Sequence, residues 1–430
     1  DTNLKILIPI SIVLIPAFLS LFFAIPVYLL SFFHKFKSLI LILIFSLILG
    51  IFEFFRGHIL TGFPWNLFIY SLSNKTSYIQ MTSFLGTYGL NLITITFFLI
   101  PAILFLKKTK FELILSFVLF FSFFLFFFIG EFRINEQSRI SKNQKNFQIK
   151  VISSNIDIKR FYDSSKEDEI IDEMINISNP KKEIPTLFIW PEGTLTSTYL
   201  KDIDKYKTSF KRFSKKHLIL FGINDLNEDD NLKIYNSLVI VDNELNIKAL
   251  YHKNDLVPFG EFLPIENILN KIGLRSITNN YLSFSEGDRR DIISINNNDF
   301  KLNILPLICY EIIYSGNLSK NNNYDLIINI SEDGWFGKSI GPHQHFIHSV
   351  FRAIEEGKSV IRSSNNGISA IIDPKGKILK INKSTTSGVL SIYGFEKLSE
   401  MTVFSSYGRN NIFFYLVLIY ITLIFFLKRQ

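Results

Sequence analysis

Long apolar runs separated by short polar loops dominate both ends of the chain. A helix needs about 20 mostly apolar residues to cross the hydrocarbon core of a bilayer, and runs of this length with few charges are rare in soluble cores. The first run is long enough to span with tilt or with a kink at Pro16 or Pro26. We predict five transmembrane helices, at residues 6–33, 39–55, 83–106, 111–130 and 412–427.

The middle of the chain, residues 145–395, alternates short β-rich runs with helical stretches. Strands that are apolar throughout are typical of sheets covered on both faces, and their alternation with helices indicates an α/β domain. The predicted helices are 165–178 and 342–357. The predicted strands are 147–155, 186–192, 217–223, 234–242, 301–310, 324–331 and 369–379.

These patterns predict three parts. Residues 1–130 form transmembrane helices, residues 131–400 form a catalytic α/β domain, and residues 401–430 form a C-terminal transmembrane helix. The first residue is Asp1 rather than Met, and no signal peptide is visible. We therefore expect that the chain was processed or that N-terminal spans are missing.

The formal net charge is +8, and many of the basic residues lie in short loops between the apolar runs. No DNA- or RNA-binding motif is visible, so the charge favours a membrane surface over nucleic acid as the partner. Loops 34–37 and 107–110 and the terminal Lys428-Arg429 are densely basic, which predicts that they lie in the cytoplasm. Asp1 and residues 131–411 then lie on the opposite face.

Residues 57–72 are apolar but too short and too broken to span. They predict a re-entrant or interfacial segment, with Trp65 and Tyr70 at the level of the lipid headgroups.

The chain has one cysteine, Cys309, so no intramolecular disulfide can form. It ends an apolar run and precedes a predicted helix. Backbone N–H groups and a helix N-terminus at such a turn are expected to lower a thiol pKa and to hold an oxyanion. A buried structural cysteine would have the same local sequence, so the neighbouring motifs must decide.

Two further motifs follow apolar strands. Glu192 lies in the sequence WPEG, directly after Pro191, and Lys253 lies in YHKNDLVPFGE. Each residue taken alone is consistent with a solvated surface charge. Together with Cys309 they supply a base, a cation and a nucleophile, and the backbone N–H of Tyr310 adds an oxyanion donor, which is what thiol attack on a carbonyl requires.

These motifs resemble the nitrilase superfamily and, within it, the apolipoprotein N-acyltransferases, over nearly the whole chain. The motifs that carry the resemblance are RGHILTGFPW (56–65), WPE (190–192), YHKNDLVPFGEFLP (251–264), ICYEI (308–312), GWFGKSIGPHQH (334–345) and RSSNNG (362–367). The resemblance implies an αββα sandwich on the periplasmic side of a multi-span helical membrane domain. Soluble nitrilases share the three catalytic residue types but lack the spans and the TGFPW segment.

The resemblance also implies roles for individual residues. The catalytic residues fall on Glu192, Lys253 and Cys309. The additional functional acids fall on Glu261 and Glu311, and the tyrosine beside the nucleophile falls on Tyr310. We expect Glu261 to hold the Lys253 ammonium on the reacting carbonyl and Glu311 to tune the segment after the nucleophile.

Substrate contacts are expected from Trp335, Phe336 and Tyr162, the last standing where the family usually has Trp. Glu332 stands where the family often has Asn. His343, His345 and His348 have no acidic or cysteine partner at ligand spacing, and the chemistry needs no metal or other cofactor. We expect these histidines to pack or hydrogen-bond near the mouth of the site.

The implied activity is transfer of an acyl chain from a membrane phospholipid, through a Cys309 thioester, to the N-terminal amine of a diacylglyceryl-cysteine apolipoprotein. The implied location is the bacterial inner membrane, and no nucleic acid is expected as a partner. One alternative is a membrane-anchored amidase with water as the acceptor, although that enzyme would need at most one anchor. The other is an inactive scaffold or receptor, and the complete set of Glu192, Lys253 and Cys309 speaks against it.

Overall fold

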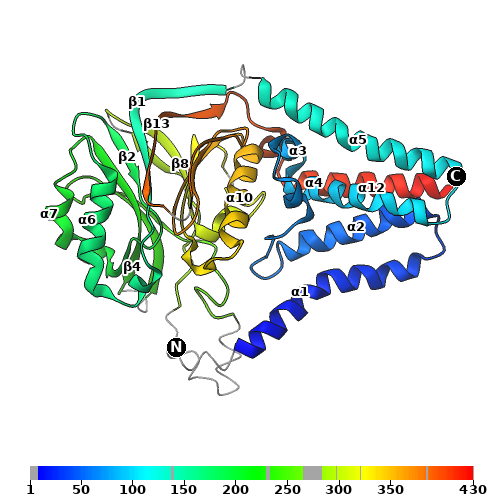
Figure 1. Cartoon of the computed structure of the whole chain (residues 1–430), viewed down its shortest axis with the longest axis horizontal. Helices are drawn as coiled ribbons and strands as arrows, with labels where there is room; N and C mark the ends of the chain where they lie inside the picture. The colour runs from blue at the N-terminus through cyan, green and yellow to red at the C-terminus, as the bar shows by residue number, and fades with distance from the viewer. Residues whose placement is uncertain are drawn as a thin grey trace.

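The computed structural model describes residues 8–136, 140–228, 233–264, 283–296, 298–319, 321–383 and 386–429. Figure 1 shows a bundle of long helices at one end of the molecule and an α/β sandwich at the other. This arrangement confirms the predicted combination of a multi-helix apolar domain with an α/β sandwich. Asp1, which the charge pattern assigns to the outside, lies beyond the described residues.

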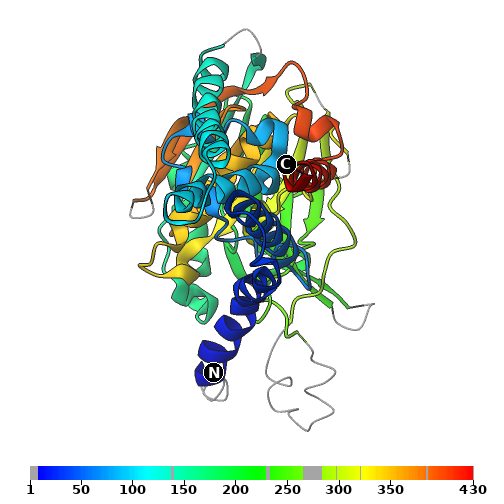
Figure 2. The same ribbon diagram turned by 90° about the vertical axis from the view of Figure 1, so that its right-hand side faces the viewer.

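Each of the five predicted apolar runs forms a helix that is long and apolar enough to cross a membrane. α1 continues through both Pro16 and Pro26, and it leans away from the bundle toward its N-terminal end (Figure 2). α2 and α4 lie at the centre of the bundle, whereas the peripheral α1, α5 and α12 expose apolar side chains, as lipid-facing helices do. The bounds are α1 Ile8–Leu30, α2 Ser38–Arg56, α4 Thr82–Leu99, α5 Lys110–Asn135 and α12 Asn411–Arg429.

The basic loops all lie at the end of the bundle that is remote from the sandwich (Figure 1). Ser38 Oγ donates to the Lys107 carbonyl at 2.5 Å, and Lys428 Nζ lies 5.2 Å from the ring centroid of Phe36. One side of a membrane can therefore hold all three loops while the sandwich lies on the other.

Two sheets form the sandwich. In the first, the strand order is β13-β1-β2-β4-β5-β6, with β3 paired to β4; in the second it is β12-β11-β10-β9-β8-β7. The first sheet comprises β1 Ile140–Ser153, β2 Thr186–Ile189, β3 Leu195–Tyr199, β4 His217–Asn227, β5 Lys233–Val241, β6 Ile247–His252 and β13 Gly388–Leu398. The second comprises β7 Ile293–Asn296, β8 Lys301–Ile308, β9 Leu326–Glu332, β10 Ser359–Asn365, β11 Ser369–Ile372 and β12 Ile378–Asn382.

The prediction of one strand over 369–379 is wrong. The structure has β11 and β12 on either side of a turn in which Asp373 Oδ1 accepts from the N–H groups of Lys375 and Lys377, each at 2.8 Å. Gly376 has φ +78°, a conformation that glycine adopts without strain. The DPKG sequence is therefore the turn of a hairpin.

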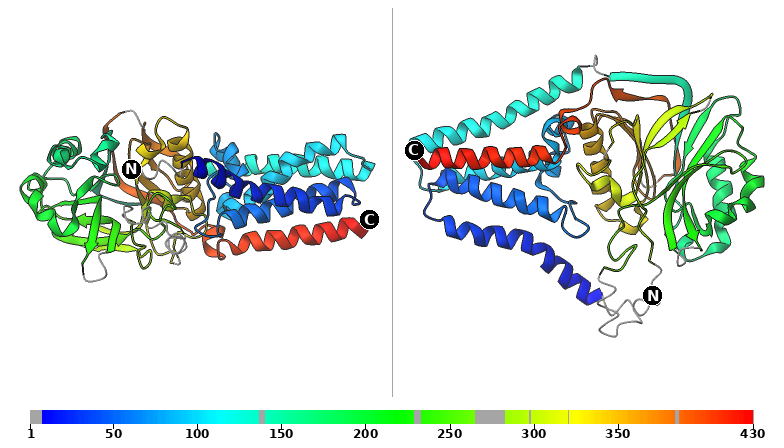
Figure 3. Two further views of the ribbon diagram at one scale, coloured as in Figure 1. Left: turned by 90° about the horizontal axis from the view of Figure 1, so that it is seen from below. Right: turned by 180° about the vertical axis from the view of Figure 1, so that it is seen from behind.

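Four layers result from the apolar faces of these elements. Aliphatic side chains of the two sheets, such as Ile189 and Ile308, form a common core between them. α6 Glu167–Ser178 and α7 Lys207–Phe210 cover the outer face of the first sheet. α10 Gly341–Glu356 covers the second sheet and lies between that sheet and the membrane helices (Figure 3). The catalytic sandwich and the bundle thus share one hydrophobic core across α10.

Segment 57–72 connects α2 to α3 Thr76–Ile79 and includes a short 3-10 helix, η3 Phe68–Leu72. The sequence predicts that Trp65 and Tyr70 lie at the level of the lipid headgroups. In the structure, both residues contact the α/β sandwich. Trp65 Nε1 donates to Gln344 Oε1 of α10 at 2.8 Å, and the ring of Tyr70 packs edge-on against Phe351 of the same helix. The segment therefore docks the membrane bundle onto the sandwich.

Candidate active site

Three strand ends bring the predicted catalytic residues together. Glu192 follows β2, Lys253 follows β6, and Cys309 follows β8 at the start of the 3-10 helix η9 Cys309–Ile313. Lys253 Nζ lies 3.6 Å from Glu192 Oε1. The charges of both residues shift the pKa of the nearby Cys309 thiol. Glu192 and Lys253 are buried, whereas Cys309 is half-buried. The two charged residues are therefore shielded from water, whereas part of the Cys309 residue remains accessible.

Glu192 is held by hydrogen bonds at both carboxylate oxygens. Asn236 Nδ2 donates to Oε1 and the backbone N–H of Glu332 donates to Oε2, each at 2.8 Å. Burial raises the pKa of Glu192 above its usual value, against the opposing effect of the Lys253 ammonium. A carboxylate with a raised pKa is better able to accept and return a proton.

Lys253 is a buried cation with two carboxylate neighbours. Its Nζ atom lies 2.8 Å from Glu261 Oε1 in addition to its longer contact with Glu192. Burial would lower the pKa of Lys253, but Glu261 and Glu192 outweigh that effect and hold the pKa above its usual value. The side chain therefore stays protonated at neutral pH.

The thiol of Cys309 does not have the lowered pKa expected from its place at a helix N-terminus. Burial and the Glu192 carboxylate raise the pKa of Cys309 well above its usual value, and the ammonium of Lys253 only partly offsets this. η9 is a single short turn of five residues, so its dipole contributes little. Cys309 is therefore protonated at neutral pH, and it would need a base in order to act as a nucleophile.

Glu261 links the loop that begins at Lys253 (the lysine loop, residues 253–261) to Glu192, the proposed base. It accepts from Lys253 Nζ and Asn236 Nδ2 through Oε1 and from the Val257 N–H through Oε2, all at 2.8 Å. Asn236 thus bridges the carboxylates of Glu261 and Glu192.

Glu311 links the turn that contains Cys309 (the nucleophile turn, residues 308–311) to the lysine loop. Its Oε2 accepts from the Ile308 N–H at 2.7 Å, and its Oε1 accepts from Tyr251 Oη at 2.6 Å and from the Asn254 N–H at 2.9 Å. Burial would raise the pKa of Glu311, but the Arg290 guanidinium, 2.9 Å away, and these donors hold the pKa below its usual value.

The residues expected at the substrate rim lie at varied depths. Trp335 is exposed and packs against Phe161, with ring centroids 5.0 Å apart, and Phe336 packs against Trp65 at 5.4 Å. Tyr162 is 82% exposed, and its neighbour Phe161 is the residue that lies against both Trp335 and the turn after Glu192.

Glu332, at a position where the resemblance suggested Asn, forms a buried ion pair with Arg160. Arg160 Nε also donates to the Gly193 carbonyl at 2.9 Å, beside the base. Tyr310 is buried, and its Oη donates to the Gly62 carbonyl at 3.1 Å, which links the nucleophile turn to segment 57–72.

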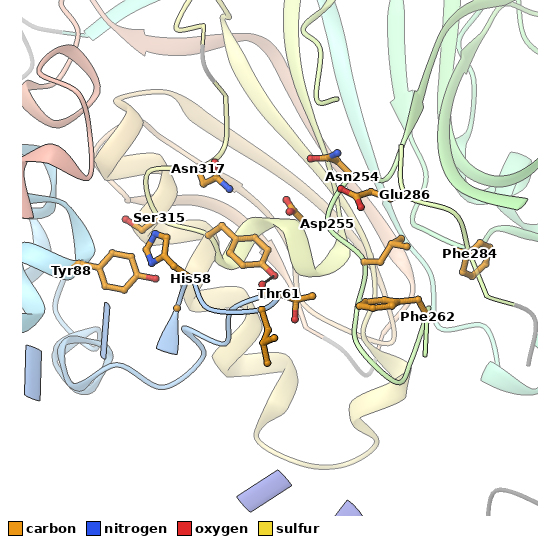
Figure 4. A pocket seen from close by; sticks show the side chains of 14 residues that line it. His58, Thr61, Tyr88, Asn254, Asp255, Phe262, Phe284, Glu286, Ser315 and Asn317 are labelled. Carbon is orange, nitrogen blue, oxygen red and sulfur yellow. Dashed lines mark hydrogen bonds between the residues drawn. The ribbon is translucent and has the colours of Figure 1, made fainter. Parts of the chain in front are cut away.

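A cavity of about 440 Å³ lies between segment 57–72, called the membrane segment below, and the sandwich. Figure 4 shows His58 and Thr61 of the membrane segment on one side and Asn254 and Asp255, which directly follow Lys253, on the other. Tyr314, just after η9, also lines it, and its Oη donates to the Thr61 carbonyl at 2.7 Å. The cavity therefore adjoins both the lysine loop and the nucleophile turn.

Several residues of the site are not evident from the sequence. Asn236 is a polar residue within a strand, Arg290 lies in a polar loop, and the buried Asp333 contacts Arg362. The WPE, HKND and ICYE motifs point to the carboxylates and the lysine but carry no information on these partners.

Family models match both parts of the chain. The carbon-nitrogen hydrolase model matches residues 187–393, and the model of the apolipoprotein N-acyltransferase N-terminal domain matches residues 2–100. Among solved structures, a CN-hydrolase superfamily protein from Xanthomonas campestris is 15% identical, with a TM-score of 0.39 over 63% of this chain and 96% of that chain. An amidase from Nesterenkonia sp. AN1 is 12% identical, with a TM-score of 0.39 over 59% of this chain and 91% of that chain.

Curated relatives match most of the chain. The apolipoprotein N-acyltransferase of Rickettsia prowazekii is 36% identical over 395 residues, which cover 90% of this chain and 76% of the relative. That of Rhodopseudomonas palustris is 32% identical over 400 residues, with 89% and 73% covered. The chain belongs to the apolipoprotein N-acyltransferase family.

Proposed function

We propose that this membrane enzyme transfers an acyl chain from a phospholipid to the N-terminal amine of a diacylglyceryl-cysteine lipoprotein, with Cys309 as the nucleophile. The observation that carries the proposal is the buried Glu192–Lys253 pair beside the half-buried thiol, in a site joined to the membrane bundle through segment 57–72. Family membership supports acyl transfer over the amidase alternative.

In the first half-reaction, Glu192 takes the proton of the Cys309 thiol as the sulfur attacks the ester carbonyl of the phospholipid. The Lys253 ammonium and the Tyr310 N–H stabilise the tetrahedral oxyanion. The intermediate collapses, the carbon–oxygen bond to the glycerol breaks, and Glu192 returns the proton to the departing alkoxide. The products are a Cys309 thioester and a lysophospholipid.

In the second half-reaction, the neutral amine of the lipoprotein attacks the thioester carbonyl. Glu192 takes a proton from the amine nitrogen, the same oxyanion donors act again, and the carbon–sulfur bond breaks. The proton passes to the sulfur, which regenerates the thiol and Glu192 carboxylate and leaves an amide. Since no water enters the balanced reaction, the thioester must be protected from hydrolysis between the two steps.

Glu261 and Glu311 position these groups. Glu261 fixes the Lys253 ammonium through its 2.8 Å contact, and Glu311 fixes the backbone before Cys309 and the backbone after Lys253. The exposed Trp335, the adjoining Phe336 and the more peripheral Tyr162 are proposed to contact the lipid chains at the rim.

The membrane parts supply the substrates. We propose that the helices within residues 1–130 and 401–430 anchor the catalytic domain, residues 131–400, on the periplasmic side of the bacterial inner membrane. Grouping of the basic loops at the far end of the bundle supports this orientation. The cavity between the membrane segment and the sandwich would then give lipids access to the site from the bilayer.

One experiment separates this function from its rivals. Purified enzyme receives a phospholipid labelled in its acyl chain together with a diacylated lipopeptide, and the label is traced to products. The proposal predicts labelled triacylated lipopeptide and unlabelled lysophospholipid, with little free fatty acid. Label that appears as fatty acid whether or not lipopeptide is present would identify a hydrolase, and label that remains in the phospholipid would indicate an inactive scaffold.

A further inference from the structure

A fully buried polar cluster contacts the backbone carbonyl of Cys309. It includes Asn329 at 0% exposure and His345, also at 0%. His345 Nε2 lies 3.1 Å from the carbonyl oxygen of Cys309, and Asn329 Nδ2 lies 3.4 Å from the same oxygen. Side chains from α10 and β9 therefore both lie within hydrogen-bonding distance of the Cys309 carbonyl oxygen.

The far side of the His345 ring is fixed as well. Its Nδ1 lies 2.9 Å from Asp333 Oδ1 and 3.1 Å from an Arg362 nitrogen, and the same nitrogen lies 2.8 Å from Asp333 Oδ2. A carbonyl oxygen can only accept, so the contact with Cys309 is favourable when the proton is on Nε2. In this tautomer Nδ1 accepts from Arg362, and Asp333 accepts from the same Arg362 nitrogen. Arg362, held by Asp333, thus orients the imidazole with its Nε2–H toward Cys309.

The backbone at Cys309 needs such support. Its φ is +50°, in the left-handed region, which costs a non-glycine residue about 1–3 kcal/mol and persists only where the surroundings enforce it. The C=O of Cys309 and the N–H of Tyr310 belong to one planar peptide group and point in opposite directions. Any contact that fixes the carbonyl therefore also fixes the direction of the N–H.

We propose that His345 is a positioning residue that aims the Tyr310 N–H at the oxyanion by holding the carbonyl of Cys309. His345 touches no reacting atom in this arrangement. Tyr310 is in the first turn of η9, where an N–H has no acceptor within the helix and is available to the substrate. The inference rests on the proposed acyl transfer, because only a reaction with an oxyanion uses that N–H.

Two reactions of the same thiol test this role. A phospholipid ester acylates Cys309 through an oxyanion, whereas iodoacetamide alkylates the thiolate by displacement and forms none. In His345→Leu, we expect single-turnover acylation to slow by about 100-fold, the effect of losing one oxyanion donor. Alkylation should stay within about twofold of wild type, because the thiol and its charged neighbours are unchanged.

Amide variants separate a hydrogen bond from a packing effect. The Nε2 of Gln can reach the position of the imidazole Nε2 and donate to the Cys309 carbonyl, so His345→Gln should recover most of the acylation rate. His345→Asn is too short and should remain slow, and this pair decides the question if the leucine variant does not fold. The matched control is His343→Leu, an exposed histidine on the same helix.

The outcomes that overturn the inference are distinct. Wild-type acylation in His345→Leu, or equal rates in the Gln and Asn variants, would show that the Cys309 carbonyl contact does not aim the N–H. Equal losses of acylation and alkylation would show a general structural role instead. A wild-type enzyme that alkylates normally but forms no acyl adduct would overturn the proposed function and this inference with it.

Discussion

The Nζ atom of Lys253 lies 2.8 Å from Glu261 Oε1, closer than the 3.6 Å that separates it from Glu192. Glu261, rather than the proposed base, is therefore the main partner of the buried ammonium. This leaves Glu192 available for proton transfer while the positive charge stays fixed beside the thiol.

Glu261→Gln should disturb this division. With one carboxylate left, Lys253 is expected to move toward Glu192 and to hold it as the ionised partner, which lowers its basicity. We expect kcat to fall by about 100-fold, within the range of general-base contributions. Steady-state acyl transfer measures it, and Glu244→Gln, an exposed acid in a turn, is the control. Activity equal to wild type would show that Glu261 does not hold the lysine.

Glu311→Gln should affect folding as well as rate. The substitution removes one of the two carboxylates that pair with Arg290, and Asp255 remains as the other. We therefore expect a cost below that of leaving a buried charge unpaired, which is about 3–5 kcal/mol. Thermal unfolding in detergent or nanodiscs should show a clearly lower midpoint together with reduced acyl transfer. Tyr251→Phe, which removes one neutral donor to Glu311 and one acceptor for Arg290 but leaves the ion pair, should cost about 1 kcal/mol for each lost hydrogen bond. If the unfolding midpoint of Glu311→Gln is no lower than that of Tyr251→Phe, Glu311 does not hold the nucleophile turn and the lysine loop together.

The raised thiol pKa predicts a particular pH dependence. Because the pKa of Cys309 lies above its usual value, the thiolate fraction is small at pH 7 and grows about tenfold for each pH unit below the pKa. The rate of iodoacetamide alkylation should therefore rise through pH 7 to about 9 without a plateau, whereas the denatured chain should level off near the ordinary thiol pKa of about 8.5. Lys253→Met should be slower still, since the ammonium lowers the pKa. A plateau below pH 8 in the native enzyme would refute the assignment.

The orientation of the chain can be tested with reporter fusions. Insertions in loops 34–37 and 107–110 and a fusion after Arg429 should score as cytoplasmic, because these basic segments meet at one end of the bundle. An insertion at Glu244, in a turn of the sandwich, should score as periplasmic. A cytoplasmic signal at Glu244 would reverse the orientation.

Much of the architecture follows from local patterns in the sequence. The apolar runs predict the five long apolar helices found among the described residues, because a span depends on composition over a single segment. Glu192, Lys253 and Cys309 can be found because each follows a strand and carries chemistry in a short motif. The prediction of a single strand over 369–379 is wrong because the DPKG turn divides this run into two strands.

Other features depend on contacts between distant segments and leave no local pattern. Asn236 contacts Glu192 across 44 residues, and the contact of His345 with the Cys309 carbonyl spans 36. The direction of the thiol pKa shift is set by burial, which outweighs the short helix turn on which the sequence-based expectation relied. Phe161 packs against Trp335 while the adjacent Tyr162 is exposed, and no local pattern predicts which of the two neighbours packs inward.

The most direct test of the mechanism is to incubate the enzyme with phospholipid alone. We expect an acyl adduct on the Cys309 peptide, seen as a mass increase, released by hydroxylamine and discharged as triacylated product when lipopeptide is added. Initial rates with both substrates varied should give parallel lines, as a thioester between two half-reactions requires. Converging lines without any adduct on Cys309 would mean direct transfer in a ternary complex and would contradict the account.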